Sequence, residues 1–301
     1  MTSSAAIPTV TIGMPVFNGA RYLEAAVSSA LDQDYPDLEV VIADNGSSDQ
    51  TVEIARSFAE RDPRVRVYQH SENLGAARNY NFVVDEARGR YFRWLAHDDL
   101  CGPGLVRQAV ELLDSRPDCV LAFARTRYVD DEARTIRDEG PIRWNGSSRV
   151  SRLESLLADA FDSHLHRCGP VLGFIRTDVL RRTGRIAPHN SSDKTLLVEL
   201  ALHGDWAEIS EHLQLRRLHE GNSLAVAKSD ADIAAWFDPR HHGKYPMPRT
   251  RLFRSYLSAI NRTSMPTSER LSCLRVLAGL FRKEWRVIGG EVKIRLRQAM
   301  G

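Results

Sequence analysis

Short apolar runs and stretches of helical periodicity alternate along the first third of the chain. Strands are predicted at the apolar runs 9–16, 38–43, 65–68 and 91–95. Helices are predicted at the amphipathic stretches 22–31, 50–59 and 76–87. This series is typical of an α/β fold with a mostly parallel sheet covered by helices. Ligands of such sheets bind beyond the carboxyl ends of the strands, which directs attention to residues 15–19, 44–49 and 96–99.

The pattern continues less regularly downstream. Helices are predicted at 104–113, 152–160 and 194–203, and strands at 119–124, 171–175 and 213–218. The polar stretch 130–146 is predicted to be a loop. From residue 251 onward apolar residues recur at helical spacing with arginines between them, as at Leu277, Phe281 and Trp285. We therefore expect an α/β domain over residues 1–245 and a basic, amphipathic helical C-terminal region over residues 246–301.

The composition is that of an ordinary globular protein, with 43% hydrophobic and 27% charged residues. The net charge is only +2, but from residue 249 to the end there are 12 Lys and Arg residues against 3 Asp and Glu residues. This asymmetry indicates an acidic partner for the C-terminal region. The partner can be an anionic membrane surface, a phosphorylated lipid acceptor or the acidic remainder of the same chain.

Neither a secretory leader nor a membrane span is evident. No basic segment followed by an apolar run opens the chain, and no apolar stretch approaches the roughly 18 residues of a spanning helix. We therefore expect a cytoplasmic protein. The cysteines at 101, 119, 168 and 273 show no CxxC spacing, which favours buried or idle thiols over a disulfide framework or a zinc site.

Carboxylates follow two of the predicted strands. Asp44 comes after the second strand, and Asp98 and Asp99 come after the fourth. The chain has no GxxxxGK[ST] motif and no GxGxxG after its first strand, which disfavours a P-loop enzyme or a dinucleotide dehydrogenase. Adjacent carboxylates suit Mg²⁺ or Mn²⁺, which prefer oxygen ligands and often bind substrate phosphates as well. The alternative is that Asp99 caps a helix beginning near Pro103.

Four motifs in order resemble those of family 2 glycosyltransferases, whose fold is named GT-A. They are Met14-Pro-Val-Phe-Asn-Gly19, Ala43-Asp-Asn-Gly-Ser-Ser-Asp-Gln-Thr51, Glu72-Asn-Leu-Gly-Ala-Ala-Arg-Asn79 and Leu95-Ala-His-Asp-Asp-Leu100. Each motif alone is weak, but their order over about one hundred residues is specific. The resemblance extends more loosely to about residue 225 and does not cover the C-terminal helices.

The resemblance implies a role for each matching residue of the donor site. Pro15 and Phe17 would line a nucleoside pocket, Asp44 would accept a hydrogen bond from the base, and Arg78 would contact the nucleotide. The alternatives are a turn-forming role for Asp44 and a solvated helix face for Arg78.

For the metal site, the resemblance implies that Asp99 coordinates Mn²⁺ or Mg²⁺. Asp98 would approach the ribose or bind the metal through water. Ala96 stands where many members have another Asp, so less negative charge surrounds the metal.

Two further assignments come from the same resemblance. Asp193, in the first turn of a predicted helix, would be the catalytic base, although Ser192 stands where the family often has Glu. A helix N-terminus favours an ionised carboxylate, and the alternative for Asp193 is a helix cap. His219 would be a third metal ligand, the alternative being an ordinary surface or core histidine. Arg216, Arg217 and Lys228 could contact phosphate oxygens or be solvated charges.

The resemblance implies inverting transfer of a sugar from a nucleotide diphosphate donor, by default a UDP-sugar, to an acceptor hydroxyl. The acceptor would be a saccharide or a lipid-linked molecule, in polysaccharide or glycoconjugate biosynthesis, and we expect no nucleic-acid partner. Two alternatives stay open: a glycan or lipid-phosphate binding protein with a decayed catalytic site, and a sugar nucleotidyltransferase.

Aromatic and basic residues alternate over 251–297, which indicates peripheral contact with an anionic membrane, at its inner face for a cytoplasmic protein. Packing on the protein's own domain or a homodimer interface is the alternative for this region.

Overall fold

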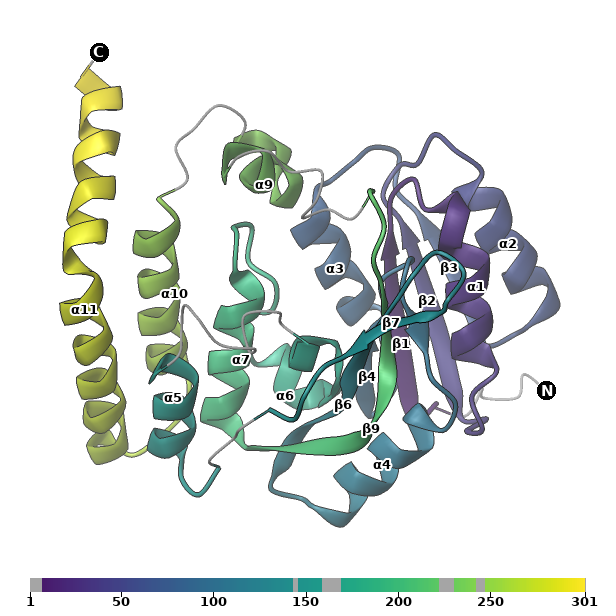
Figure 1. Cartoon of the computed structure of the whole chain (residues 1–301), viewed down its shortest axis with the longest axis horizontal. Helices are drawn as coiled ribbons and strands as arrows, with labels where there is room; N and C mark the ends of the chain where they lie inside the picture. The colour runs from purple at the N-terminus through teal and green to yellow at the C-terminus, as the bar shows by residue number, and fades with distance from the viewer. Residues whose placement is uncertain (1–6, 143–145, 159–168, 222–229, 242–246, 301) are drawn as a thin grey trace.

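A twisted nine-stranded sheet runs through the molecule, with helices on both faces (Figure 1). The computed structural model describes residues 7–142, 146–158, 169–221, 230–241 and 247–300. Its strands are β1 (Val10–Val16), β2 (Leu38–Asp44), β3 (Val65–Gln69), β4 (Tyr91–Trp94), β5 (Leu100–Cys101), β6 (Cys119–Val129), β7 (Thr135–Asp138), β8 (Phe174–Arg176) and β9 (Asp205–Arg217).

The described helices range from one turn to 34 residues. They are α1 (Ala20–Leu31), α2 (Thr51–Arg61), α3 (Ala76–Asp85), α4 (Leu105–Ser115), α5 (Arg149–Ala158), α6 (Thr177–Arg181), α7 (Ser192–His203), α9 (Asp230–Phe237), α10 (Pro248–Arg262) and α11 (Thr267–Met300). Two short 3-10 helices, η2 (Gly169–Leu172) and η3 (Pro239–His241), lie between them.

The strand order β3-β2-β1-β4-β8-β6-β9-β5 gathers most carboxyl ends at one edge, and β7 pairs with β6. β1 is parallel to β2 and β4, and β2 is parallel to β3. β8 is antiparallel to both β4 and β6, so β6 runs in the direction of β4, and β9 is parallel to β6. The prediction of a mostly parallel sheet is thus confirmed, and the loops after β1, β2, β4, β6 and β9 meet at the same edge.

Each face of the sheet carries its own hydrophobic core. Successive side chains of a strand point to opposite faces. Accordingly Val41 and Ala43 belong to the core shared with α3, α5, α7, α10 and α11, whereas Val40 and Ile42 belong to the core shared with α1, α2 and α4. The continuous burial of β1 and β2 on both sides explains why apolar runs revealed them.

The sequence prediction is wrong in the polar stretch 130–146, which contains β7. All four residues of β7 are exposed, so no apolar alternation marks the strand. It is held to β6 by backbone pairing and by the ion pair between Arg127 and Asp138, at 2.6 Å. β9 begins eight residues before its predicted start, because Asp205–Glu208 already pair with the first residues of β6, Cys119–Phe123.

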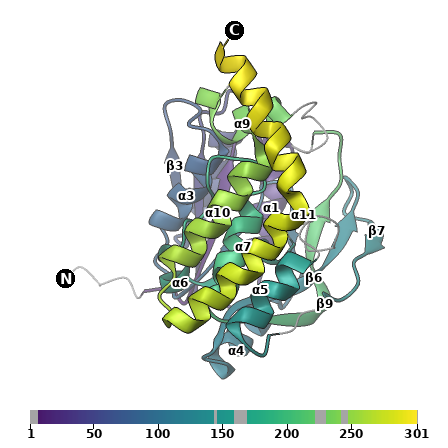
Figure 2. The ribbon, with the colours of Figure 1, turned by 90° about the vertical axis from the view of Figure 1, so that its left-hand side faces the viewer.

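The C-terminal region is helical, as predicted, and forms an antiparallel hairpin of α10 and α11 against α7 and α5 (Figure 2). Leu252, Tyr256 and Leu277 are buried in the same core as α7. Glu291 joins the two helices, because its carboxylate accepts hydrogen bonds from the N–H groups of Arg249 at 2.9 Å and Thr250 at 2.8 Å. The expected boundary near residue 245 falls in the segment 242–246, outside the described residues.

Cys101, Cys119 and Cys273 are free and buried, as predicted, and Cys168 lies outside the described residues. Among the helices that the structure describes, none is both long enough and apolar enough to cross a bilayer.

Candidate nucleotide and metal site

The loops after β1 and β2 are joined by hydrogen bonds at the carboxyl edge of the sheet. Three successive backbone N–H groups of the first loop donate to side chains of the second. The pairs are Asn18 with Ser47 Oγ at 2.8 Å, Gly19 with Thr51 Oγ1 at 2.8 Å, and Ala20 with Asp49 Oδ2 at 3.1 Å. These N–H groups are therefore engaged within the protein and do not form an open phosphate cradle of the P-loop kind.

Asp49 is held in its ionised form by this network. Burial acts to raise the pKa of Asp49, but hydrogen bonds from Thr51 and Ala20 outweigh burial and lower the pKa below its usual value.

Asp44 shapes the second loop. Its side chain is completely buried and accepts hydrogen bonds from the N–H groups of Gly46 at 3.2 Å and Ser47 at 3.1 Å. Gly46 has φ +76°, and a Cβ there would lie 2.8 Å from the carbonyl carbon of Glu72. The turn-forming interpretation of Asp44 is confirmed, and its contact with a nucleotide base stays a prediction.

Asparagine side chains tie the segment before α3 to the strand ends. Asn45 donates to Asn73 Oδ1 at 2.9 Å and accepts from the N–H of Leu74 at 2.9 Å. Asn79, almost fully buried, donates to the carbonyl oxygen of Ala43 at 2.8 Å. These asparagines lie within the motifs, but the sequence alone indicates no role for them, since their contacts depend on the packing of separate loops.

The other predicted nucleotide residues lie at the same edge with different exposure. Phe17 follows β1 with 43% of its surface exposed, and Arg78 is exposed in the first turn of α3. Pro15 lies inside β1, buried and opposite Ala43 in the parallel register. Phe17 and Arg78 are thus open to a ligand, whereas Pro15 supports the strand end from within.

The acidic motif is brought to β9 by the short strand β5. Leu100 and Cys101 pair antiparallel with Leu215 and Gln214, which sets the preceding Asp98 and Asp99 beside the end of β9. Asp98 Oδ2 lies 3.0 Å from Nε2 of His219, and both side chains are mostly buried, with 15% and 8% exposed. Two neighbouring ligands of an octahedral cation, each at about 2.1 Å from it, are separated by about 3 Å. In this structure the same distance is that of a hydrogen bond between the carboxylate and the imidazole. The separation is compatible with two ligands of one cation, and metal binding by the pair stays a prediction.

Asp99 is more deeply buried than Asp98, with 4% of its surface exposed. Its Oδ1 accepts from the N–H of Arg217 at 3.0 Å, and Oδ2 lies 4.0 Å from Nε of Arg216. Burial, followed by the charge of Asp98, raises the pKa of Asp99 to about 7, with Arg216 and the buried Arg93 acting against this. The helix-cap alternative for Asp99 is wrong, because α4 begins only at Leu105 after Gly104.

The described residues contain no group of three or more His, Cys, Asp and Glu side chains that could hold a metal. A cation at Asp98 and His219 would therefore take its remaining ligands from substrate phosphates and water, as Mg²⁺ commonly does. The neighbouring His97 faces Gly19, where a Cβ would lie 2.6 Å from the imidazole ring. Burial lowers the pKa of His97, so the residue packs as a neutral ring in this part of the site.

Two residues without a role in the sequence analysis lie near His219: Tyr22 packs against its ring, and Asp131 binds Tyr22. The ring of Tyr22, on α1, lies 4.6 Å from the imidazole, and its hydroxyl donates to Asp131 Oδ1 at 2.6 Å. Arg217 lies over the same tyrosine ring at 4.8 Å. Asp131 comes from the loop after β6, within the stretch predicted only as polar loop. No motif signals Tyr22 or Asp131, because their partners lie far away in the sequence.

Asp193 lies in the first turn of α7, partly exposed. The side chain of Tyr80 is partly buried. Its pKa is raised first by burial and then by the charges of Asp98 and Asp99, with a smaller contribution from Asp193. The hydroxyl of Tyr80 therefore lies within electrostatic range of both the acidic motif and the predicted base. Lys228, a predicted phosphate contact, lies outside the described residues.

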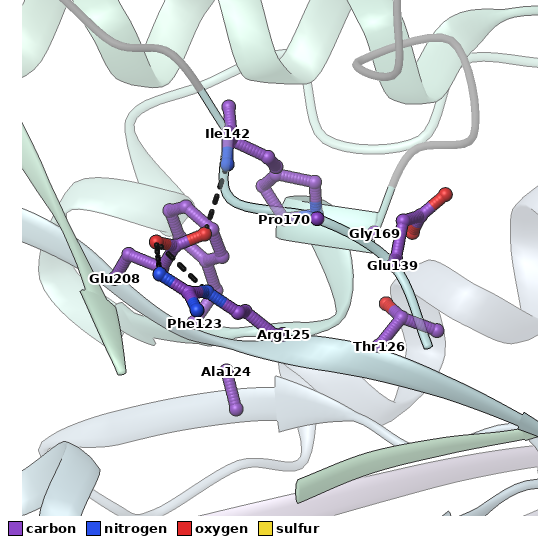
Figure 3. A pocket seen from close by; sticks show the side chains of 10 residues that line it. Phe123, Ala124, Arg125, Thr126, Glu139, Ile142, Gly169, Pro170 and Glu208 are labelled. Atoms are coloured by element: carbon purple, nitrogen blue, oxygen red, sulfur yellow. Dashed lines mark hydrogen bonds and ion pairs between the residues drawn. The ribbon is translucent and has the colours of Figure 1, made fainter. Parts of the chain in front are cut away.

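A separate shallow pocket opens beside the middle of β6 (Figure 3). Its polar centre is the ion pair between Arg125 and Glu208 at 3.1 Å, and Glu208 also accepts from the N–H of Ile142 at 3.0 Å. It contains none of the predicted site residues. Since its central charges already neutralise each other, we place the candidate site at the strand ends and not in this pocket.

The model of the family "Glycosyl transferase family 2" matches residues 11–183. An uncharacterised glycosyltransferase of Rickettsia bellii is 39% identical over 182 residues, which are 58% of this chain and 25% of that protein. A hyaluronan synthase of Pasteurella multocida is 29% identical over 225 residues, 74% of this chain and 22% of that protein. The matched part thus spans well under half of the length of these relatives.

Solved structures share the fold at low sequence identity. TarS 1–349 of S. aureus in complex with UDP-GlcNAc has a TM-score of 0.66 and 15% identity, over 92% of this chain and 73% of that one. The mannosyltransferase PcManGT of Pyrobaculum calidifontis, in complex with GDP-Man and Mn²⁺, has a TM-score of 0.54 and 17% identity, over 99% of this chain and 82% of that one. At such identities the likeness shows the architecture alone.

Proposed function

This chain belongs to glycosyltransferase family 2 and has the GT-A architecture, and from this premise we propose that it transfers a sugar from a nucleoside diphosphate donor to an acceptor hydroxyl with the help of a divalent cation. The observation that carries the proposal is the pair of Asp98 Oδ2 and His219 Nε2, 3.0 Å apart at the carboxyl edge of the sheet. Its position follows the rule that ligands of such sheets bind beyond the strand ends.

Asp98 and His219 would hold Mn²⁺ or Mg²⁺ directly. This differs from the resemblance, which implies Asp99 as the direct ligand, because Asp99 is almost fully buried behind the pair and accepts from the N–H of Arg217. When bound, the cation neutralises charge on the departing diphosphate. Support for a metal comes from the similar fold of PcManGT, described as a complex with Mn²⁺. Arg216, 4.0 Å from Asp99, is positioned to add positive charge at the same place.

The nucleotide would lie between the exposed Phe17 and Arg78, over the loop that Asp44 shapes. We take a UDP-sugar as the donor, since TarS, which shares the architecture, has been solved with UDP and with UDP-GlcNAc. A saccharide acceptor is suggested by the likeness to hyaluronan and chondroitin synthases, and a lipid-linked acceptor stays the alternative.

Asp193 would act as the general base. It would accept the proton of the acceptor hydroxyl while that oxygen attacks the anomeric carbon and the bond from this carbon to the diphosphate breaks. A single displacement of this kind inverts the anomeric configuration and needs no covalent enzyme intermediate. The N-terminus of α7 favours the ionised carboxylate that this role requires.

Two alternatives receive less support. A sugar nucleotidyltransferase needs open backbone N–H groups after β1, but three of these are engaged by side chains of the next loop. A decayed binding protein is suggested by Ala96 and Ser192, where acids often stand in the family. Such a protein would lack metal-dependent turnover of the donor.

The test is a thermal shift with UDP, dTDP, GDP and CDP, each with and without Mn²⁺, since a ligand that binds only the folded state raises the melting temperature. We expect one diphosphate to give a shift that requires the metal. Asp98→Asn and His219→Gln should abolish the metal requirement and most of the shift, whereas His212→Gln, a histidine of β9 that contacts the carbonyl oxygen of Glu139, should not.

Asp193→Asn separates binding from chemistry. It should keep the metal-dependent shift and lose sugar transfer by roughly 100-fold or more. No shift with any diphosphate would contradict the donor site, and equal loss of binding in the Asp98 and Asp193 variants would contradict the division of roles.

A further inference from the structure

The outer half of α11 is largely uncovered. From residue 281 to residue 297 only Glu291 is buried, and the helix rises along the side of the molecule to the end where α9 lies (Figures 1 and 2). Phe281 is 41% exposed, Trp285 55% and Leu296 56%. Because α10 begins at Pro248, beside Glu291, the residues beyond 291 extend past the hairpin.

These exposed residues form two adjacent stripes. At 3.6 residues per turn, Phe281, Trp285, Val292 and Leu296 fall within about 60° of one another on the helix surface, and we name them the apolar stripe. The next sector of about 60° contains the basic stripe, which consists of Arg275, Arg282, Arg286, Lys293 and Arg297. The face toward α10 and α5 is a third sector, with Cys273, Leu277 and Leu280.

The acidic residues of α11 are all engaged on the inner side. Glu269 forms an ion pair with Arg149, Glu284 lies 3.9 Å from Arg249, and Glu291 accepts from the start of α10. No residue of the basic stripe forms an ion pair with another described residue. The uncovered face of α11 thus combines large apolar side chains with positive charge that the described part of the chain does not neutralise.

We propose that the apolar and basic stripes of α11 bind the surface of an anionic lipid bilayer. Helices that lie in a bilayer interface carry Trp, Phe and Leu on one side and Lys and Arg beside them. Each basic residue near an anionic bilayer adds attraction, which salt screens. A second copy of the chain is a less favourable partner for this face. In a symmetric dimer it would place its own basic stripe against the first one, and like charges repel.

The location of α11 indicates which end of the molecule would face the bilayer. The end of α9 packs on the segment before α3, which belongs to the proposed donor site. A Cβ at Gly75 in this segment would lie only 2.7 Å from the carbonyl oxygen of Phe237 in α9. The exposed end of α11 and the carboxyl edge of the sheet therefore lie toward the same end of the molecule (Figure 1). Binding through the stripes would hold that end near the bilayer. The proposal itself does not depend on the proposed reaction.

The test is flotation of the full chain with vesicles of phosphatidylcholine alone or of phosphatidylcholine with phosphatidylglycerol. We expect flotation only with the anionic vesicles, at low salt and not at high salt. Replacing Arg282, Arg286 and Lys293 together by Gln should weaken partitioning by about fivefold per residue, so on the order of 100-fold. The matched control replaces the exposed Arg88, Arg107 and Arg134 by Gln, with the same change of charge and little expected loss.

The apolar stripe is tested with Trp285→Ser and Leu296→Ser together, against Ile136→Ser on β7, which is 51% exposed. Only the first variant should lose flotation, and unchanged melting temperatures would show that all variants fold. The proposal is overturned if the wild-type chain stays unbound at low salt or if both charge variants weaken binding equally. It is also overturned if light scattering shows a dimer that the Trp285 variant dissociates while flotation is unchanged.

Discussion

Two of the site carboxylates are anchored by the main chain. Asp44 accepts from the N–H groups of Gly46 and Ser47, and Asp99 accepts from the N–H of Arg217. Removing such a carboxylate leaves buried N–H groups without a partner, which costs about 1–3 kcal/mol each. Alanine substitutions at these positions would therefore reduce stability together with ligand binding, so Asn is the more informative replacement.

Tyr22 packs against His219, and we expect it to position this proposed metal ligand. Tyr22→Phe keeps the ring against His219 but removes the hydroxyl bond to Asp131, whereas Tyr22→Ala removes both. We expect the Mn²⁺ concentration for half-maximal diphosphate-dependent stabilisation to rise several-fold in the first variant and about 10- to 100-fold in the second. A Mn²⁺ titration of the thermal shift measures both.

The control is Tyr91→Phe, which removes an equivalent bond between a tyrosine and Asp114 away from the site. It should lower the melting temperature without changing the Mn²⁺ midpoint. If Tyr22→Phe also changes only the melting temperature, Tyr22 is a structural residue and not a positioning residue.

Motifs made the acidic pair and Asp44 predictable from the sequence, because these residues directly follow strands with a clear apolar signal. Tyr22, Asn79 and Asp131 were not assigned a role. Tyr22 and Asp131 are 109 residues apart, and Asn79 reaches Ala43 across 36 residues. Contacts of this kind follow from how loops pack, which one sequence does not reveal.

At the scale of elements, strands buried on both faces were predicted well, whereas the two-residue strand β5 and the exposed strand β7 were not. β1 and β2 are continuously buried, and their apolar runs predict them. β5 has two residues and β7 has four exposed ones, so neither carries an apolar pattern of its own. β5 is nevertheless the strand that brings Asp98 to His219. The contact between these two residues could therefore not be predicted from the sequence.

An ion pair attaches the C-terminal helices to the α/β domain. Arg262 of α10 donates to both oxygens of Glu199 of α7, at 2.8 and 2.9 Å, and Glu199 is 1% exposed. Arg262→Gln should destabilise the fold by about 2 kcal/mol, less than for a fully buried pair because the arginine is 42% exposed. Urea denaturation measures the loss, with the exposed Arg254→Gln on the same helix as control.

The loss should depend on pH. Burial raises the pKa of Glu199 above 4.5, with the N–H of Gly184 and the charge of Arg262 acting against it. Removing Arg262 raises this pKa further. An acid with a raised pKa in the folded state contributes stability at low pH that is lost as the pH rises through that pKa. The Arg262 variant should therefore lose more stability in neutral solution than in mildly acidic solution, and equal losses would contradict the pair.

At the scale of the whole molecule, strand order explains why the site gathers where it does. β8 lies between β4 and β6 and is antiparallel to both, so β6 and β9 run in the same direction as β1, β2 and β4. The loops after β6 and β9 therefore lie at the same edge as the loops after β1, β2 and β4. The sequence predicted most of these strands but not their order, because order is set by long-range pairing. Asp131 and His219 reach the site only through this arrangement.

The way α11 ends has a consequence for proteolysis. Between residues 291 and 297 of α11, Glu291 alone is buried, and the preceding Gly289 and Gly290 are poor helix formers with no atom within 4 Å of an added Cβ. Beyond them Lys293, Arg295 and Arg297 are exposed, and each is a trypsin cleavage site. Local opening of this end should cost little free energy.

Brief trypsin treatment should therefore first remove the segment after Lys293 and leave the hairpin of α10 and α11 intact, as mass spectrometry of the fragments would show. Anionic vesicles should slow these cuts and leave cleavage at Arg88 unchanged, and a first cut inside α10 would contradict this order. An enzyme trimmed at this end would keep its fold and its strand-end site while losing Leu296 and Arg297, so proteolysis would weaken its attachment to a membrane without inactivating it.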